Sequence, residues 1–527
     1  MKRSSQSSDI CTLCRPFDDQ SQPRIWLETH ALCVVLGLVE TGTSAWRASA
    51  CCLADSIVGT CRVGRGVGGF LFRHFPLAQI VALWLCSWRM NRRSFLSSTV
   101  SSSLLATAPY VIGQTTDRVY RAALIGSGWW GMNLLTEGLA SKRLKCVALA
   151  DVDQNARESS ADELEGLTGS KPKTYGDYRE LLAKEKPDLV IIATPDHWHA
   201  LTTIAAVNAG AHVLVEKPTG HTVNESRAML KAAREAGKVV QVGLHRRLGP
   251  HHVAAHVFLK SGKVGEIGAV RCFVTGGGGK KETPSKNTEP PPGLDWDMWC
   301  GPAPLRPFTS KLHPGAWRSW LDFGNGQLGD WGVHWLDQVL WWTEEKWPKK
   351  VFSTGGRPVL GAPILNEKEQ TSDAPDSQVA VFEFEGFTAT WEHRRFADNN
   401  AEKHKIGAYF YGTKGTLHIG WRDGWTFYPA NAKDPIVHGD SQLQEPDGHN
   451  LKLLWDDFLK AIDTNTKPTC DIEIAHRSSV LPLLGMASLK AGRSLQWDGD
   501  KEQIIGDAEA NQLLSRPYRG PWEYPAV

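Results

Sequence analysis

The sequence has almost no excess of charge of either sign. Its 527 residues include 59 lysines and arginines and 57 aspartates and glutamates, which gives a formal net charge of +2. No basic stripe that could follow a nucleic-acid backbone is present, and the chain has no long acidic tail. We therefore expect no nucleic-acid partner. A chain of this length is expected to form two or three domains with ordinary hydrophobic cores.

The sequence also lacks a cysteine pattern that would build a disulfide framework or a zinc site. Seven of its eleven cysteines precede residue 90, and the other four are scattered between positions 146 and 470. Cys11 and Cys14 form a C-x-x-C pair, but no second pair and no histidine cluster has the spacing of zinc ligands. We predict no disulfide framework and no metal site.

Long hydrophobic runs are absent as well. The apolar run at 77–88 is too short to cross a bilayer, and Arg73, His74 and Pro76 interrupt the stretch before it. We therefore expect no stable membrane span.

A different composition begins at Met90. Arg92 and Arg93 precede a moderately apolar, serine-rich run at 95–108 that ends in an A-x-A cleavage site. This layout is typical of a twin-arginine signal peptide, which we place at 90–114. It predicts export to the periplasm or cell envelope, and a cytoplasmic location is the alternative.

A signal peptide does not normally begin at residue 90. One hypothesis is that Met90 is the true start and that residues 1–89 are a mis-called extension. The other is that residues 1–89 are a real, disordered leader.

What the chain does contain is a glycine-rich turn of the form G-x-G-x-x-G after a predicted strand at 119–125. The turn reads Gly126-Ser127-Gly128-Trp129-Trp130-Gly131, and a predicted helix follows it. Gly126 permits the tight turn, Gly128 leaves room for a pyrophosphate, and Gly131 lets the helix pack closely on the strand. The phosphate then lies at the N-terminus of the helix.

An acidic residue follows at the position that a dinucleotide site requires. Asp151 ends the predicted strand at 145–150, twenty residues after Gly131. Its carboxylate can accept hydrogen bonds from both ribose hydroxyls and would repel a 2′-phosphate. The sequence therefore favours NAD over NADP.

Two further motifs follow buried strands of the same half. Thr194-Pro195 with His199 comes after the strand at 189–193, and Glu216-Lys217-Pro218 comes after the strand at 212–215. Strands and helices alternate through this half, which predicts a Rossmann domain with a doubly wound parallel sheet at 119–244. Its carboxyl edge is where such sheets bind ligands.

After Gly243 the alternation of strands and helices stops. A helix is predicted at 250–260, and five predicted strands at 267–275, 378–384, 387–394, 408–412 and 416–420 suit an open, mainly antiparallel sheet. The fold class is thus α/β followed by α+β. We expect a substrate and oligomerisation domain at 245–500 and a closing segment at 501–527.

The third motif, Asp330-Trp331-Gly332-Val333-His334, carries a carboxylate and an imidazole four residues apart. On a helix the two side chains share one face. His334 can act as acid or base near neutral pH, and a carboxylate can orient its ring. Lys217 can hold a substrate oxygen and stabilise alkoxide charge. By itself, His334 could equally be a core histidine, and Asp337 could be a structural or substrate-positioning carboxylate.

These motifs together resemble the glucose–fructose oxidoreductase, inositol dehydrogenase and MocA group, over residues 119–527. The resemblance implies a catalytic set of Lys217, Asp330 and His334, and a substrate that lies between the nucleotide and the second sheet. It implies a nicotinamide cofactor, held tightly in some relatives, and a homo-oligomer (dimer or tetramer) that forms through the far face of the open sheet. The cofactor-binding positions it implies are Gly126, Ser127, Gly128, Trp129, Trp130, Gly131, Asp151, Thr194, Pro195, His199, Glu216 and Lys217. The substrate-binding positions are Arg246, Trp331 and Asp337.

Nine of the 22 tryptophans lie between Trp296 and Trp347. They could stack on the faces of sugar rings or simply pack in a core. Our interpretation is an NAD(P)-dependent oxidoreductase that acts on a CH–OH group of a sugar, cyclitol or glycoside. The alternatives are a redox-assisted glycoside hydrolase with the same first step and a non-catalytic nucleotide-binding protein. Leu248-Gly249 stands where many relatives carry an aromatic or acidic residue, so no substrate preference is carried over.

Overall fold

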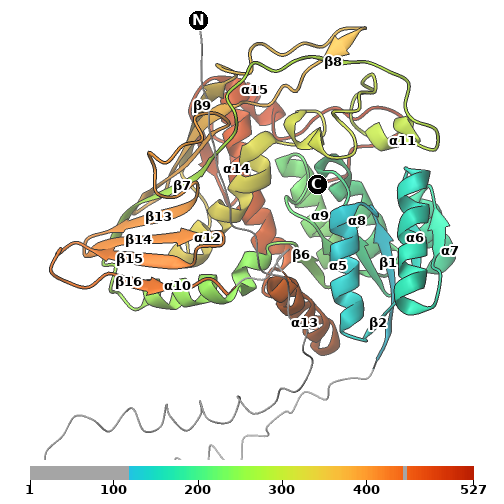
Figure 1. Cartoon of the computed structure of the whole chain (residues 1–527), viewed down its shortest axis with the longest axis horizontal. Helices are drawn as coiled ribbons and strands as arrows, with labels where there is room; N and C mark the ends of the chain where they lie inside the picture. Colours follow the sequence, from blue (N-terminus) through green and yellow to red (C-terminus); the bar gives the residue numbers. More distant parts are fainter. Residues whose placement is uncertain (1–117, 443–447) are drawn as a thin grey trace, which may run out of the picture. The chain divides into compact units, whose positions relative to one another are not determined.

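The computed structural model describes residues 118–442 and 448–527 (Figure 1). The predicted signal peptide at 90–114 and the extension at 1–89 lie outside these residues. No helix of the described part is both long enough and apolar enough to cross a membrane.

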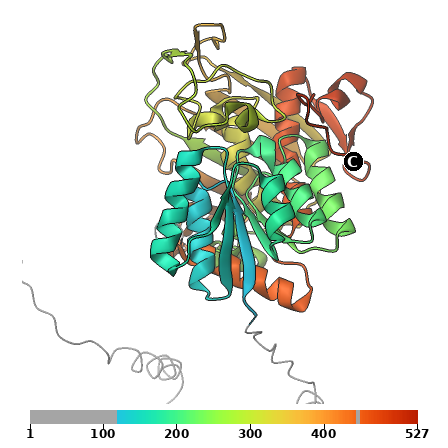
Figure 2. The same cartoon turned by 90° about the vertical axis from the view of Figure 1, so that its right-hand side faces the viewer.

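The first half is built on a six-stranded sheet whose paired strands are all parallel. Its strand order is β3-β2-β1-β4-β5-β6, so β2 and β3 lie on one side of β1 and the later strands on the other, and the order switches between β1 and β4. The strands are β1 (Tyr120–Ile125), β2 (Leu144–Ala150), β3 (Lys173–Tyr175), β4 (Leu189–Ile192), β5 (His212–Val215) and β6 (Val240–Val242). The sheet is buried on both faces because helices flank it on two sides (Figure 2).

Helices alternate with the strands of this half, as the sequence predicted. They are α5 (Trp129–Ala140), α6 (Gln154–Thr168), α7 (Tyr178–Glu185), α8 (His199–Asn208) and α9 (Val223–Glu235). A later helix, α13 (Gly448–Thr464), joins them: Trp455 belongs to the same hydrophobic core and its indole N–H donates to the carbonyl oxygen of Leu134 at 2.9 Å. This half thus has a Rossmann fold completed by a helix from far along the chain.

The second half is built on a ten-stranded sheet, ordered β16-β15-β14-β13-β7-β12-β11-β9-β17-β18. Its pairings are antiparallel except that of β7 with β12, which is parallel. The strands are β7 (Ile267–Thr275), β9 (Lys350–Gly356), β11 (Ser377–Glu383), β12 (Thr388–Arg394), β13 (Ile406–Gly412), β14 (Gly415–Gly420), β15 (Trp425–Pro429), β16 (Val437–Gly439), β17 (Leu495–Asp498) and β18 (Gln503–Ile504). Sheet and Rossmann fold together confirm the predicted fold class.

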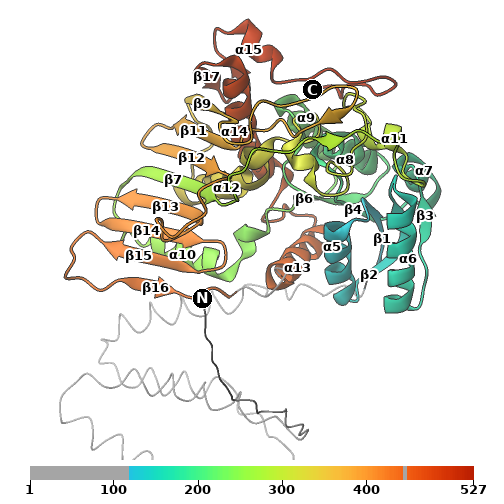
Figure 3. The ribbon, with the colours of Figure 1, turned by 45° about the horizontal axis from the view of Figure 1, so that its top comes forward.

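Three helices, α10 (Pro250–Lys260), α12 (Val333–Thr343) and α14 (Ile472–Ala491), share a hydrophobic core with the large sheet (Figure 3). α14 also packs on α9 of the Rossmann half, so it links the two sheets. The remaining short elements are β8 (Ser285–Lys286), β10 (Glu369–Gln370), α11 (Trp296–Cys300) and α15 (Ala508–Gln512).

Most of the clustered tryptophans pack in cores. Trp296, Trp299, Trp317 and Trp320 form a small third core with Phe323 and other apolar residues. Trp335 and Trp342 belong to the core of the large sheet. Packing therefore accounts for most of this composition, although three of the nine tryptophans also border the cavity described below.

The C-terminal segment lies against the Rossmann half. The Tyr518 hydroxyl donates to Glu225 Oε1 at 2.7 Å, and Arg516 Nε donates to the same oxygen at 2.8 Å. The Trp522 ring meets that of Trp198 edge-on, with 4.8 Å between centroids. These contacts fasten the end of the chain to α9 and to the turn that precedes α8.

Candidate active site

A cavity of about 840 Å³ lies at the carboxyl edge of the parallel sheet and extends to the start of α12. It has the size and the largely apolar wall of a small-molecule or cofactor site. Thirteen of the predicted site residues line it: Gly126, Gly128, Trp129, Trp130, Asp151, Thr194, Pro195, His199, Glu216, Lys217, Asp330, Trp331 and His334. The structure therefore brings the three sequence motifs to one place.

The glycine-rich turn has the shape that its sequence predicts. Gly126 has a φ of +90°, and a Cβ there would lie 2.8 Å from the backbone of Ala193. A Cβ on Gly131 would overlap the carbonyl oxygen of Gly126, whereas a Cβ on Gly128 would meet nothing within 4 Å. The open space beside Gly128 lies at the N-terminus of α5, where no side chain caps the first-turn amides. A pyrophosphate fits this arrangement.

Asp151 sits at the end of β2 with its carboxylate held by backbone groups. Its Oδ2 accepts the N–H of Ser127 at 2.8 Å, and its Oδ1 accepts the N–H of Asp153 at 3.0 Å. Burial raises the pKa of Asp151, and the two N–H bonds oppose that rise. The carboxylate is thus fixed on the cavity wall, where a ribose would lie beside the turn.

Glu216 ties the glycine-rich turn to the end of β5. Its Oε1 accepts the indole N–H of Trp130 at 2.7 Å, and its Oε2 accepts the N–H of Lys217 at 3.1 Å. A Cβ at Gly243 would overlap the Glu216 carboxylate. The carboxylate therefore positions the peptide that carries Lys217.

His199 joins the loops that follow β4 and β5. Its Nδ1 lies 2.8 Å from the carbonyl oxygen of Pro218 and its Nε2 lies 2.9 Å from that of Thr194. The ring is fully buried, and burial lowers its pKa. The contacts that the structure shows for His199 hold the floor of the cavity together.

Lys217 and Asp330 form an ion pair in this cavity. Lys217 Nζ lies 2.7 Å from Asp330 Oδ1 and 3.0 Å from the carbonyl oxygen of Asp330. Arg318 Nε donates to the same carboxylate oxygen at 3.2 Å. Burial would raise the pKa of Asp330, but Lys217 and Arg318 outweigh it and hold that pKa below its ordinary value.

The backbone at Asp330 differs from the regular helix that we predicted. Residues Leu328–Gly332 form a π-helical turn, and α12 begins only at Val333. Such turns are frequent at functional sites. Within the described residues Asp330 makes no hydrogen bond to His334, so the predicted orientation of the imidazole by this carboxylate has no direct contact in support. Its side chain is bound to Lys217 and Arg318 instead.

His334 lies in an aromatic and cationic surrounding. Its ring centroid is 5.0 Å from that of Trp421 and 5.7 Å from that of His245. Burial, together with the positive field of Lys217 and of nearby imidazole and guanidinium groups, holds the pKa of His334 well below its ordinary value. The imidazole is therefore neutral at neutral pH and has a lone pair that can take up a proton.

Two predicted substrate contacts lie behind the cavity wall. Arg246 is 1% exposed, with its guanidinium 3.4 Å above the Trp421 ring. Asp337 is fully buried, pairs with Arg247 at 2.8 Å and accepts the hydroxyl of Ser478 at 2.7 Å. Neither residue borders the cavity, so their positions do not support direct contact with a substrate. Both are placed to hold the wall.

The cavity residues that sequence reasoning missed include Asp196, Arg318, Trp421 and Arg422. Asp196 directly follows Thr194-Pro195, and its position after a buried strand was the available signal. Burial raises its pKa to about 8, although Lys217 and Arg318 oppose the rise. Trp421 and Arg422 lie in the turn between β14 and β15, and no local pattern marks that turn as part of a site.

Three family models match most of the described chain. The model "Oxidoreductase family, NAD-binding Rossmann fold" matches residues 120–244. The model "GFO/IDH/MocA C-terminal domain" matches residues 252–418, and "Oxidoreductase family, C-terminal alpha/beta domain" matches residues 398–524.

Curated relatives include inositol 2-dehydrogenase 1 of Saccharopolyspora erythraea, which is 31% identical over 29% of this chain. That match spans only 44% of the length of the relative. D-glucoside 3-dehydrogenase of Escherichia coli is 26% identical over 60% of this chain and 79% of its own.

Among solved structures, levoglucosan dehydrogenase in complex with NADH and levoglucosan covers 72% of this chain and 99% of its own, with a TM-score of 0.55. At 20% identity this likeness bears on the fold alone.

Proposed function

The chain belongs to the GFO/IDH/MocA oxidoreductase family, and we propose that it transfers a hydride between a nicotinamide cofactor and a hydroxyl-bearing carbon of a sugar, cyclitol or glycoside. One observation carries this proposal. The Lys217–Asp330 ion pair and the neutral His334 border the same cavity as the glycine-rich turn. A nucleotide on that turn and a carbinol beside His334 would share one enclosed space.

NAD is the proposed cofactor, with NADP less favoured. The turn at Gly126–Gly131 would hold the pyrophosphate, and Asp151 would accept the ribose hydroxyls. The segment after β2 reads Asp151-Val152-Asp153, which places negative charge where a 2′-phosphate would need a cation. Arg157 lies nearby, but its guanidinium donates to the carbonyl oxygen of Asp151 at 3.1 Å. When bound, the nicotinamide accepts or supplies the hydride.

The chemistry of the chain's own residues follows from their charges. In the oxidative direction the substrate O–H proton passes to a ring nitrogen of His334 as the C–H bond gives up its hydride and the carbonyl forms. Lys217 would hold the substrate oxygen and stabilise its developing negative charge. Asp330 keeps the ammonium in place and balances its charge. In the reverse direction the protonated imidazole returns the proton.

A carbohydrate substrate suits the wall of the cavity beyond the ion pair. Trp299, Trp317, Trp331 and Trp421 all border it. Indole faces stack on the apolar faces of sugar rings, and the indole N–H can bond to a hydroxyl. Arg318 and Arg422 add hydrogen-bond donors beside them.

The test combines retained nucleotide with turnover. Mass spectrometry of the purified protein should detect NAD, and a panel of sugars and cyclitols should change the absorbance of the reduced nicotinamide. Lys217→Ala protein is the control for adventitious reduction. If no substrate in the panel changes the nicotinamide and an aryl glycoside releases free sugar, the enzyme is a redox-assisted hydrolase. A protein that binds nucleotide but turns over neither class would contradict both proposals.

We further propose that the enzyme is exported by the twin-arginine segment at 90–114 and assembles as a homo-oligomer. Expression from Met90 should give a processed, translocated protein, and replacing Arg92 and Arg93 together by lysine should stop translocation. The open sheet carries exposed apolar side chains at Phe352, Val379 and Tyr411, which suit an interface between copies. Light scattering of the purified protein would measure the oligomer, and a monomer would contradict this part.

A further inference from the structure

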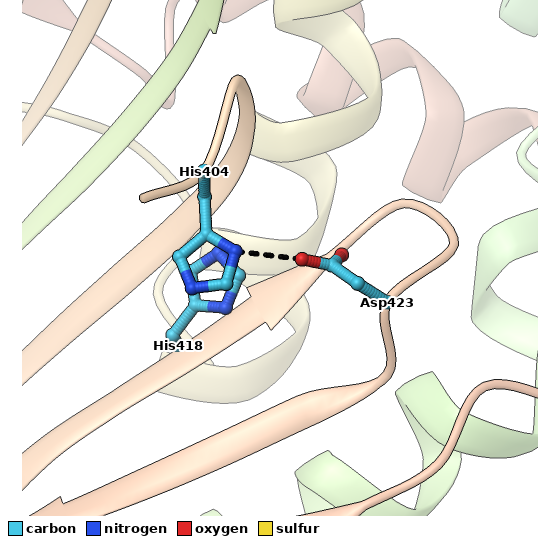
Figure 4. A group of neighbouring side chains, drawn as sticks. All are labelled: His404, His418 and Asp423. Carbon is cyan, nitrogen blue, oxygen red and sulfur yellow. Dashed lines mark hydrogen bonds and ion pairs between the residues drawn. The ribbon is translucent and has the colours of Figure 1, made fainter. Parts of the chain in front are cut away.

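Three side chains outside the cavity form a compact group of nitrogen and oxygen ligands: His404, His418 and Asp423 (Figure 4). His404 precedes β13, His418 lies on β14, and Asp423 lies in the turn between β14 and β15. One ligand atom of each lies within 4.8 Å of the others. His404 Nδ1 is 2.6 Å from Asp423 Oδ2, and the two imidazole rings stack with 3.6 Å between centroids.

The polar atoms of this group are left unsatisfied by the rest of the fold. His418 is fully buried, and neither of its ring nitrogens has a hydrogen-bond partner among the described residues. The Nε2 atom of His404 is also without one in that part of the chain. A buried polar group without a partner carries the full cost of its desolvation, so each such group needs an explanation. The ion pair with Asp423 uses Nδ1 of His404, so it leaves all three of these nitrogens without a partner among the described residues.

Two glycines leave room for the group. A Cβ at Gly407 would lie 2.6 Å from His418 Nε2. A Cβ at Gly420 would overlap the Asp423 carboxylate. The absence of a side chain at Gly407 leaves room for the His418 imidazole, and its absence at Gly420 leaves room for the Asp423 carboxylate.

We propose that His404, His418 and Asp423 bind a divalent transition-metal ion of the zinc class. Zinc takes imidazole nitrogen and carboxylate oxygen at about 2.0–2.2 Å, and three protein ligands leave a fourth position for water. Small side-chain rotations bring ligand atoms that are already within 4.8 Å of one another to a common ion. The ion would take one ring nitrogen of each histidine and so give one of the two unpartnered nitrogens of His418 a partner.

The ion would fix the turn that forms part of the cavity wall. Asp423 follows Trp421 and Arg422, which border the cavity. The centroid of the Trp421 ring lies 5.0 Å from that of His334 and 5.0 Å from that of Trp331. A metal that ties Asp423 to β14 would therefore hold the wall beside His334, with no part in hydride or proton transfer.

Metal content and thermal stability test the site without any assay of turnover. The full-length protein, equilibrated with Zn²⁺ and then desalted, should retain about one equivalent by inductively coupled plasma mass spectrometry. Its melting temperature should rise with Zn²⁺ and fall again with a chelator. Retention below a tenth of an equivalent, or no zinc-dependent shift, would overturn the proposal.

Variants separate this site from adventitious zinc binding. His418→Phe places an apolar ring beside Tyr409, whose ring centroid lies 4.8 Å from that of His418, so it should fold and melt normally with chelator present. It should lose both the retained metal and the zinc-dependent shift. His438→Ala removes a partly exposed imidazole on β16, two strands away from β14, and should keep both the retained metal and the zinc-dependent shift. Equal shifts in His418→Phe and wild type would place the metal elsewhere and refute the assignment.

Asp423→Asn is the third variant, because it keeps the shape of the side chain while removing its charge. Replacing a direct ligand should weaken zinc affinity in a chelator competition at least as much as losing an outer-shell partner does, by about 10–100-fold. Unchanged affinity would exclude Asp423 from the site and with it the proposed hold on Trp421.

Discussion

Lys217 Nζ and Asp330 Oδ1 lie 2.7 Å apart although 113 residues separate them in the sequence. This ion pair connects the end of β5 in the Rossmann half with the π-helical turn before α12. It is largely buried, and breaking such a pair by removing one partner leaves the other charge without compensation. The pair therefore shapes the cavity, and in the mechanism that we propose it also holds an ammonium where a substrate oxygen would lie.

Lys217→Ala should lower turnover by about 10²–10³-fold, the usual effect of removing one group that stabilises an oxyanion. Nucleotide affinity should change little, because the contacts of the glycine-rich turn and Asp151 remain. Steady-state kinetics and a fluorescence titration with reduced nucleotide measure the two quantities. Lys231→Ala, on the exposed side of α9, is the matched control and should behave as wild type. Equal losses in nucleotide affinity and turnover would place Lys217 in cofactor binding alone.

The kinetic effect of Asp330→Asn should resemble that of Lys217→Ala more than that of His334→Ala. The carboxylate is bound to Lys217 and Arg318, so the amide would loosen both cations and leave the imidazole where it is. We expect a fall in kcat, with the acidic limb of the pH–rate profile unmoved. A shift of that limb in Asp330→Asn would show that the carboxylate acts on His334 after all.

Much of the fold could be predicted because its signals are local. The helix expected at 250–260 is α10, and the strand expected at 267–275 is β7. Alternation of apolar and polar residues sets such elements within a few residues. Helix α13 is different, because Trp455 finds its partner, the carbonyl oxygen of Leu134, 321 residues away. No local pattern tells whether that helix packs on the first sheet or the second.

The candidate site likewise contains residues that local sequence signals predict and residues that only tertiary contacts bring together. Asp151, Thr194 and Lys217 could be placed together because parallel strands end at one edge of a sheet. Trp421 could not, since it enters from a hairpin turn of the other sheet. The i, i+4 spacing of Asp330 and His334 predicted a shared helical face, but residues Leu328–Gly332 wind as a π-turn and Asp330 pairs with Lys217. Both residues border the cavity, but the partner that Asp330 takes depends on tertiary contacts that the spacing does not show.

His334→Ala should lower turnover by about 10²–10⁴-fold, the usual contribution of general acid–base catalysis. The wild-type rate of oxidation should stay level as pH falls through 6.5, because burial and nearby cations hold the pKa of His334 well below its ordinary value. Only at more acidic pH should protonation of the base lower the rate. The pH dependence of kcat measures this, and the acidic limb should vanish in the residual activity of His334→Ala. A limb centred at or above pH 6.5 would contradict the assignment.

Asp151→Ala should weaken NAD binding by about 1.5–3 kcal/mol, the range for a hydrogen bond to a charged group. Discrimination against NADP should narrow at the same time, because the negative charge that would meet a 2′-phosphate is gone. Dissociation constants for both nucleotides, from titration of the purified protein, give the two numbers. Asp162→Asn, an exposed carboxylate on α6, is the control. A wild type that prefers NADP would refute this role of Asp151.

Asp196→Asn should stabilise the protein increasingly as pH rises. Burial raises the pKa of Asp196 to about 8, far above that of a carboxyl in the unfolded chain. Below the unfolded pKa both states hold the proton. As pH rises toward 8 only the folded state keeps the proton on Asp196, so the wild type loses folding stability over this range.

The Asp196→Asn variant has no such pH-dependent loss of stability. Its melting temperature relative to wild type should therefore climb between pH 5 and pH 9 by at least about 2 °C, the shift that ~1 kcal/mol produces. Glu163→Gln, at an exposed carboxylate on α6, should give a pH-independent difference. If Asp196→Asn also gives a constant difference, the buried carboxyl is ionised throughout, and the positive charges of Lys217 and Arg318 dominate its surroundings.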